Sequence, residues 1–62
     1  MNESKIKYTV ADELRDMGYT IENAYDWARR AVEFLRHPNH DIFVIPTHWG
    51  LWKINKNAEW VK

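Results

Sequence analysis

The chain has 62 residues, which is enough for one small domain (1–62) and leaves no room for a second. Nine basic and nine acidic residues cancel, and the absence of cysteine excludes a disulfide scaffold, a cysteine-ligated zinc site and a thiol nucleophile. No apolar run approaches the roughly 18 residues of a membrane-spanning helix. The first residues also lack the apolar stretch of a secretion signal, so we expect a cytoplasmic protein with no membrane contact.

The N-terminal part of the chain predicts an arm and a short helix. Residues 1–8 are polar apart from one Ile and one Tyr, and we expect them to form an N-terminal arm. Thr9 opens a Thr-x-x-Asp signal that is typical of a helix start. Apolar residues then recur at helical spacing from Val10 to Met17, and Gly18 can adopt the left-handed conformation that ends a helix. The first helix is therefore predicted from Val10 to Met17.

A longer amphipathic helix follows. Thr20 is predicted to cap it, with Glu22 in the first turn, where the helix dipole favours a negative charge. Pro38 ends the helix near Arg36, because the residue before a proline disfavours the helical conformation. About half of its circumference is apolar. The two helices are expected to form a helical hairpin over residues 9–37. The positions expected in the core are Val10, Leu14, Ile21, Ala24, Tyr25, Ala28, Ala31, Val32 and Leu35.

Two apolar runs predict a β-hairpin over residues 41–55. The run from Ile42 to Ile45 consists of β-branched and aromatic residues, which favour a strand. The run Leu51–Ile54 is the predicted return strand. The loop of about five residues between them contains Pro46 and Gly50, which are typical turn residues.

The fold class that follows is α+β: a short helix, a long amphipathic helix, and a β-hairpin packed on the long helix (ααββ). Residues 56–62 are too few to predict as helix or strand and are expected to form a tail. A two-stranded hairpin is marginally stable alone in water, so it must lie on the apolar face of the long helix. The same order of elements is also part of the winged-helix topology.

Nothing in the chain predicts catalysis. Three histidines, His37, His40 and His48, are candidates for a metal site, and imidazole suits zinc. However, His37 and His40 straddle Pro38 in a connector, and the spacing of the three matches no metal-binding motif. Both glycines are isolated, so no loop cradles a phosphate, and a chain this small has little volume for an enclosed pocket. We therefore expect no enzyme, no catalytic residue, no metal and no cofactor.

The pair Arg29 and Arg30 is the strongest candidate for binding a phosphate, because arginine binds such groups bidentately. Asp26 precedes the pair by three and four residues, and Glu33 follows it by three and four. These are the spacings of ordinary ion pairs on a helix. We therefore expect the two acids to neutralise the arginines, which then serve helix stability.

Tryptophans and lysines gather near the C-terminus. Trp49 lies in the predicted turn, where burial by the chain itself is hardest, and tryptophan is enriched where binding energy concentrates. One tryptophan is expected to seal the core. The alternative that Trp49, Trp52 and Trp60 all pack internally stays open, because a small domain needs large side chains for adequate burial. The residues predicted to bind a partner are Trp49, Trp52, Lys53, Lys56 and Trp60.

These features favour a small non-catalytic protein-binding module, such as an inhibitor or modulator, that docks on a partner protein through the aromatic hairpin. Intracellular adaptors and phage- or plasmid-borne regulators share this size and this lack of catalytic motifs. The alternative is a winged-helix-like DNA-binding regulator whose wing carries Lys53 and Lys56 to the phosphates. A third hypothesis is single-stranded nucleic acid stacked on Trp49 and Trp52. Zero net charge disfavours a nucleic-acid partner, and the oligomeric state stays open.

Overall fold

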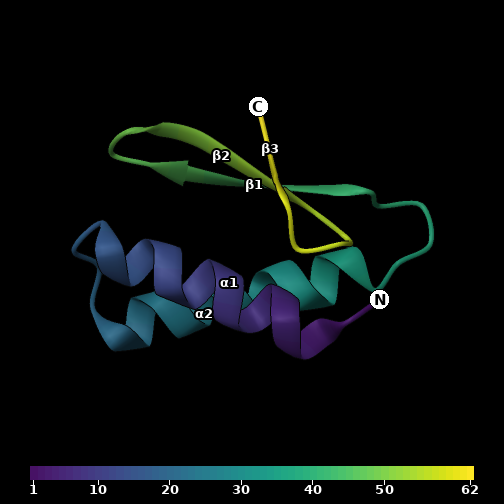
Figure 1. Cartoon of the computed structure of the whole chain (residues 1–62), viewed down its shortest axis with the longest axis horizontal. Helices are drawn as coiled ribbons and strands as arrows, with labels where there is room; N and C mark the ends of the chain where they lie inside the picture. Colours follow the sequence, from purple (N-terminus) through teal and green to yellow (C-terminus); the bar gives the residue numbers. More distant parts are fainter.

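Two helices form one layer of the protein, and a three-stranded antiparallel sheet lies across them as the second layer (Figure 1). The computed structural model describes all residues, 1–62. The predicted α+β class is confirmed, with helices first and strands after them. No helix reaches the length and apolarity that crossing a membrane requires. In chain order the elements are α1 (Glu3–Asp16), α2 (Ile21–Leu35), β1 (Ile42–Thr47), β2 (Gly50–Asn55) and β3 (Trp60–Val61).

The prediction of an N-terminal arm over residues 1–8 is wrong, because α1 begins at Glu3. Asn2 is the cap: its side-chain oxygen accepts a hydrogen bond from the N–H of Lys5 at 3.0 Å. Ile6 is fully buried, one helical turn before the first buried position that the sequence pattern predicts. Burial of Ile6 stabilises the two helical turns before Val10, which the polar composition of residues 1–8 does not favour.

An ion pair ties the start of α1 to the end of α2. Arg36 donates from Nε to Oε2 of Glu3 at 2.8 Å and from Nη2 to Oε1 at 2.9 Å. These hydrogen bonds hold the pKa of Glu3 below its usual value, and they raise the pKa of Arg36. Because both side chains are about half exposed, water screens their attraction, and the pair aligns the helix ends more than it adds to stability.

Helix α2 matches its prediction. The hydroxyl of Thr20 caps it by accepting a hydrogen bond from the N–H of Asn23 at 3.2 Å. The last helical residue is Leu35, shortly before Pro38. In the connection from α1, Gly18 has a φ of +98°, a conformation that glycine adopts without strain.

The hairpin turn is tighter than the loop of about five residues that the sequence predicts. Strands β1 and β2 pair as far as Thr47 and Gly50, so only His48 and Trp49 lie outside the strands. Gly50 has a φ of +106°, whereas the two turn residues have negative φ. This combination is typical of a type I turn followed by a left-handed residue. Pro46, which the sequence predicts in the loop, lies inside β1, an edge strand, where proline is tolerated.

The predicted tail over residues 56–62 is only partly correct, because Trp60 and Val61 form β3 beside β2. Asn55 builds the turn that returns the chain. Its side-chain oxygen accepts hydrogen bonds from the N–H groups of Asn57 at 2.9 Å and Glu59 at 3.0 Å. Its own N–H donates to the carbonyl of Glu59 at 3.0 Å. One asparagine therefore adds the third strand, a role that the residue type does not reveal in sequence.

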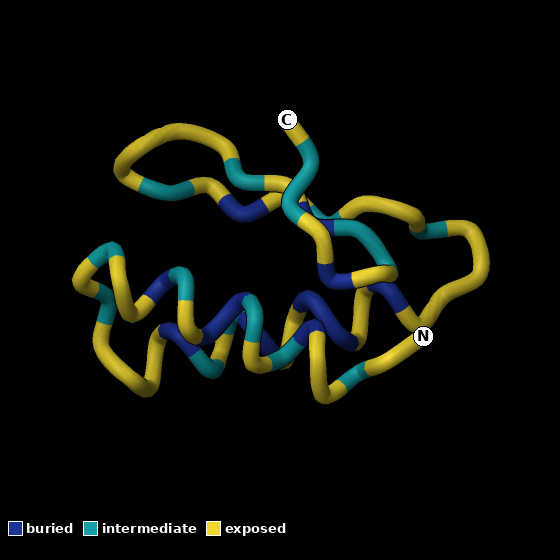
Figure 2. The backbone as a smooth tube through the Cα atoms, in the orientation of Figure 1, coloured by how far each residue is buried: buried dark blue, intermediate teal, exposed yellow.

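The core lies between the helices and the sheet, where the buried segments of Figure 2 face one another. The predicted set of core residues is wrong for Ile21, which is 54% exposed in the first turn of α2, and Tyr25, also predicted in the core, is only half-buried. It is confirmed at Val10, Leu14, Ala24, Ala28, Ala31, Val32 and Leu35. The additional buried residues are Ile6, Ala11, Ile45, Ile54 and Ala58.

Candidate protein-binding surface

The sheet has one covered face and one open face. Ile45 and Ile54 are buried in the core, so their side chains point to the helices. Side chains alternate between the two faces of a strand, and the strand register therefore assigns the remaining positions to the opposite face. We call this opposite face the outer sheet face. It consists of Ile42, Val44, Pro46, Leu51, Lys53, Asn55 and Val61.

The outer sheet face is apolar except for Lys53 and, at one end, Asn55. Leu51 is 67% exposed, Val44 is 41% exposed and Ile42 is 37% exposed. Lys53 lies opposite both Val44 and Val61 in the register, and its ammonium forms no ion pair or hydrogen bond within the chain. Large apolar side chains gathered on one exposed face mark an interaction surface more strongly than the same side chains scattered singly.

Trp49 lies at the tip of the hairpin, where it is 64% exposed and lines a shallow depression together with Met17, Gly18 and Tyr19 of the α1–α2 connection. The turn that carries it is fixed from two sides. The hydroxyl of Thr47 donates to the carbonyl of Gly50 at 2.7 Å and accepts from the N–H of Trp49 at 3.1 Å. His48 stacks on Tyr19 with ring centroids 5.9 Å apart, which anchors the turn to the α1–α2 connection. Trp49 is therefore an exposed aromatic side chain on an ordered support.

Trp52 and Trp60 lie on the other face of the sheet. The register places Trp52 opposite Ile45 and Trp60 opposite Ile54, on the side that packs on the helices. The two indoles meet edge to face, with ring centroids 5.3 Å apart, and both pack against the core while remaining half-buried. Both indoles therefore lie on the helical side of the sheet, and neither belongs to the outer sheet face.

The two predicted lysines are also far apart in the register. Lys53 belongs to the outer sheet face, whereas Lys56 lies in the turn between β2 and β3. The ammonium of Lys56 donates to the carbonyl of His37 at 3.2 Å and lies 4.0 Å from a carboxylate oxygen of Asp41. Of the five predicted residues, the structure places only Lys53 on the outer sheet face, while Trp49 lies exposed at the hairpin tip.

Sequence reasoning missed Ile42, Val44 and Leu51 as candidate binding residues. The signal was present in the unbroken apolar run from Ile42 to Ile45. A strand that covers a core on one side alternates apolar and polar residues, whereas a continuous apolar run is typical of a strand with partners on both faces. Here only one of those faces is covered by the chain itself.

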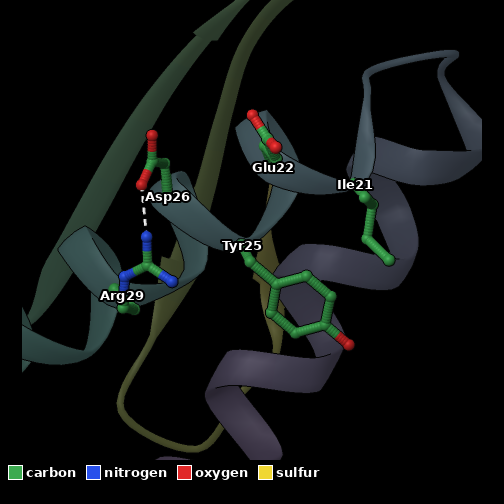
Figure 3. Close-up of a pocket in the computed structure, with 5 residues that line it drawn as sticks. All are labelled: Ile21, Glu22, Tyr25, Asp26 and Arg29. Carbon is green, nitrogen blue, oxygen red and sulfur yellow. Dashed lines mark hydrogen bonds and ion pairs between the residues drawn. The ribbon is translucent and has the colours of Figure 1, made fainter.

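A shallow depression on the helical side offers no comparable site. It has a volume of about 390 Å³ and is lined by residues of α2. Asp26, one of the two acidic residues that line the depression, already pairs with Arg29, one turn further along the helix (Figure 3). In the same view the ring of Tyr25 points toward α1, away from the carboxylate of Glu22. The polar groups of this depression therefore do not converge on a common point.

The expected neutralisation of the arginine pair is correct for Arg29 only. Arg30 has no carboxylate partner, and its guanidinium lies over the ring of Trp27 at 5.1 Å from the centroid. Glu33, the acid expected beside it, forms no ion pair. Stacking on an aromatic face leaves the N–H groups of a guanidinium free to bind a second partner.

The three histidines do not come together. The rings of His37 and His40 are 5.1 Å apart at their centroids, while His48 stacks on Tyr19 in the hairpin turn. The ring of His40 stacks on the ring of Phe34, and its Nδ1 lies 3.0 Å from the carbonyl oxygen of Phe34.

Comparisons of the chain with protein-family models, curated proteins and solved structures give no match.

Proposed function

We propose that this protein is a non-catalytic binding module, of the inhibitor or modulator kind, that docks on another protein through the outer sheet face and Trp49. The observations that support this proposal are the exposure of Leu51 and Val44 on the outer sheet face and the exposure of Trp49 at the ordered hairpin tip. A small chain has little apolar area to spare for water, since it buries only about 60% of the surface of its unfolded form. The expected cytoplasmic location stays part of the proposal.

The surface also defines the partner's chemistry. Lys53 is the cation among apolar neighbours and has no carboxylate of its own. The matching surface is therefore apolar with one carboxylate opposite Lys53. A standard interface buries roughly 800 Å² on each partner, about a fifth of the 4304 Å² that this chain exposes. Docking on that scale needs the whole outer sheet face and the hairpin tip, and not Trp49 alone.

The winged-helix alternative has weaker support. The hairpin lies flat across the helices instead of projecting from them (Figure 1). Lys53 and Lys56 do not share a surface, and Arg29 and Arg36 are held by Asp26 and Glu3. A DNA-binding domain needs a continuous basic surface for phosphates, so the docking function is preferred.

Affinity capture from a cell lysate, with and without nuclease, tests the proposal. We expect captured protein to survive nuclease and to be lost with the variant Leu51→Lys. Ile21→Lys is the matched control, because Ile21 is a similarly exposed apolar residue on the helical layer. Capture that persists in Leu51→Lys, or that disappears with nuclease, would contradict the proposal.

A further inference from the structure

One long edge of the sheet is open. In the order β1-β2-β3, strand β1 has a neighbour on one side only. The backbone N–H of Asn55 is bonded to β3, so the alternation of an antiparallel ladder assigns Phe43, Ile45 and Thr47 to the bonds with β2. The backbone groups of Ile42 and Val44 then face away from the sheet. Pro46 falls on the same side, where its missing N–H breaks no ladder bond.

This edge lacks the usual protection. Natural edge strands are shielded by charged side chains, bulges, proline or covering loops. Strand β1 carries no charged residue, and Pro46 blocks only one end of it. The N–H and C=O groups of Ile42 and Val44 therefore remain able to pair with another extended chain.

A groove runs beside the open edge. Phe43 of β1 contacts two aromatic rings of α2, with centroid distances of 6.3 Å to Trp27 and 5.4 Å to Phe34. Phe34 is still 37% exposed. The groove has a volume of about 350 Å³ and is lined by Arg30, Glu33, Phe34, His37, His40 and Phe43. The side chains of α2 beside β1 thus form an apolar floor that the sheet does not fully cover.

The widths of the two layers explain the groove. Packed helices lie roughly 8–10 Å apart, whereas neighbouring strands lie about 4.8 Å apart, so two helices match about four strands. This sheet has three strands, and β3 occupies the side away from β1. By this comparison the sheet is about one strand narrower than the helical layer, and the groove beside β1 lies on the side without a further strand.

We propose that the open edge of β1 binds one extended segment of a partner protein as a fourth, antiparallel or parallel strand, with alternate side chains in the groove. Apolar side chains of the segment pack on Phe34 and Phe43. A carboxylate of the segment binds the guanidinium of Arg30, which is held over Trp27 and has no acid partner. This mode of recognition combines main-chain hydrogen bonds for affinity with alternate side-chain contacts for specificity.

A second copy of this chain fits the edge poorly. Pairing β1 with β1 of a second copy would bring two α2 helices about one strand spacing apart, because α2 packs beneath β1. That distance of roughly 5 Å is shorter than the 8–10 Å that packed helices need. A bare extended segment brings no helix with it.

The inference goes beyond the proposed function, since it concerns the edge of the sheet and not its outer face. The probe is a displayed library of random peptides panned on the full chain. Val44→Pro removes the open N–H without touching the bonds to β2, and Val44→Thr keeps both the N–H and the side-chain shape. We expect selected peptides to carry an acidic residue between apolar ones and to lose about tenfold or more in affinity for Val44→Pro, with little change for Val44→Thr.

Amide hydrogen exchange on the unmodified chain provides a second measurement that does not depend on a variant. The amides of Ile42 and Val44 should exchange fast in the free protein and become protected when the selected peptide binds. Selection of no edge-dependent peptide, or equal binding to Val44→Pro and Val44→Thr, overturns the inference. Protection of Val44 that grows with protein concentration alone also overturns it, in favour of self-pairing. The outer-face variant Leu51→Lys should still bind the peptide, which separates this result from the fate of the proposed function.

Discussion

Introducing a carboxylate at Ala28 tests the assignment of the core. Ala28 is completely buried in the middle of α2, and no charged side chain is buried with it. A glutamate there has no partner, and burial of this kind raises a carboxyl pKa by about 3–5 units. The unfolded glutamate pKa of about 4.3 lies roughly 2.7 units below pH 7, so at 1.36 kcal/mol per unit the stability penalty at pH 7 reaches about 4 kcal/mol. The whole chain is stabilised by only about 3–9 kcal/mol, at 0.05–0.15 kcal/mol per residue.

The penalty of the buried glutamate is comparable to the free energy of unfolding of the whole chain, so Ala28→Glu should be largely unfolded at pH 7. Circular dichroism melts measure this directly, with Asn23→Glu as the matched control on the exposed side of the same helix. The sign of the pH dependence is a further check. A carboxyl whose folded pKa is raised destabilises the fold increasingly as the pH rises from the unfolded pKa to the folded pKa, and the penalty is relieved as the pH falls back toward the unfolded value. The variant should therefore gain stability relative to the unsubstituted chain on acidification. A melting temperature within a few degrees of the unsubstituted chain at pH 7 would refute the buried assignment.

Four further outcomes are expected. Trp49→Ala should lower stability by at most about 2 kcal/mol, since only about a third of its roughly 200 Å² is covered, and it should weaken partner binding by about 2 kcal/mol or more in titrations. Gly50→Ala should cost about 1–2 kcal/mol in denaturant unfolding through backbone strain alone, because an added Cβ meets no atom within 4 Å. Asn55→Ala should cost about 1–3 kcal/mol and expose the amides of β3 to fast hydrogen exchange. Arg36→Gln should reduce the melting temperature slightly at pH 7, and this difference should shrink on acidification, because the stability from the lowered pKa of Glu3 is complete above its unfolded pKa and is lost as the pH falls through its folded pKa.

Much of the helical layer follows from local chemistry in the sequence. Thr20 and Pro38 bound α2 because capping and the geometry of proline act within a few residues. The spacing of Ala24, Ala28 and Ala31 assigns the buried side, because helical periodicity is a local property. The start of α1 was readable as well, from Asn2 and Ile6, but the polarity of the surrounding residues favoured an arm.

The candidate site was less predictable from the residues alone. The sequence places Trp49 in an exposed turn correctly, because a hairpin tip projects from any partner layer. It does not separate Trp49 from Trp52 and Trp60, since the faces of a strand are assigned only when the register and the covered side are known. The structure places the latter two on the helical side.

The sequence by itself therefore determined the element order, most of α2 and the exposed tip, which depend on residues close together in the chain. Tertiary structure decided which side of the sheet stays open, because that depends on the position of the helices relative to the strand register. It also decided that β1 is an edge strand with an exposed part of α2 beside it. This is an outcome of packing between segments far apart in the chain, for which a single sequence carries no spacing signal.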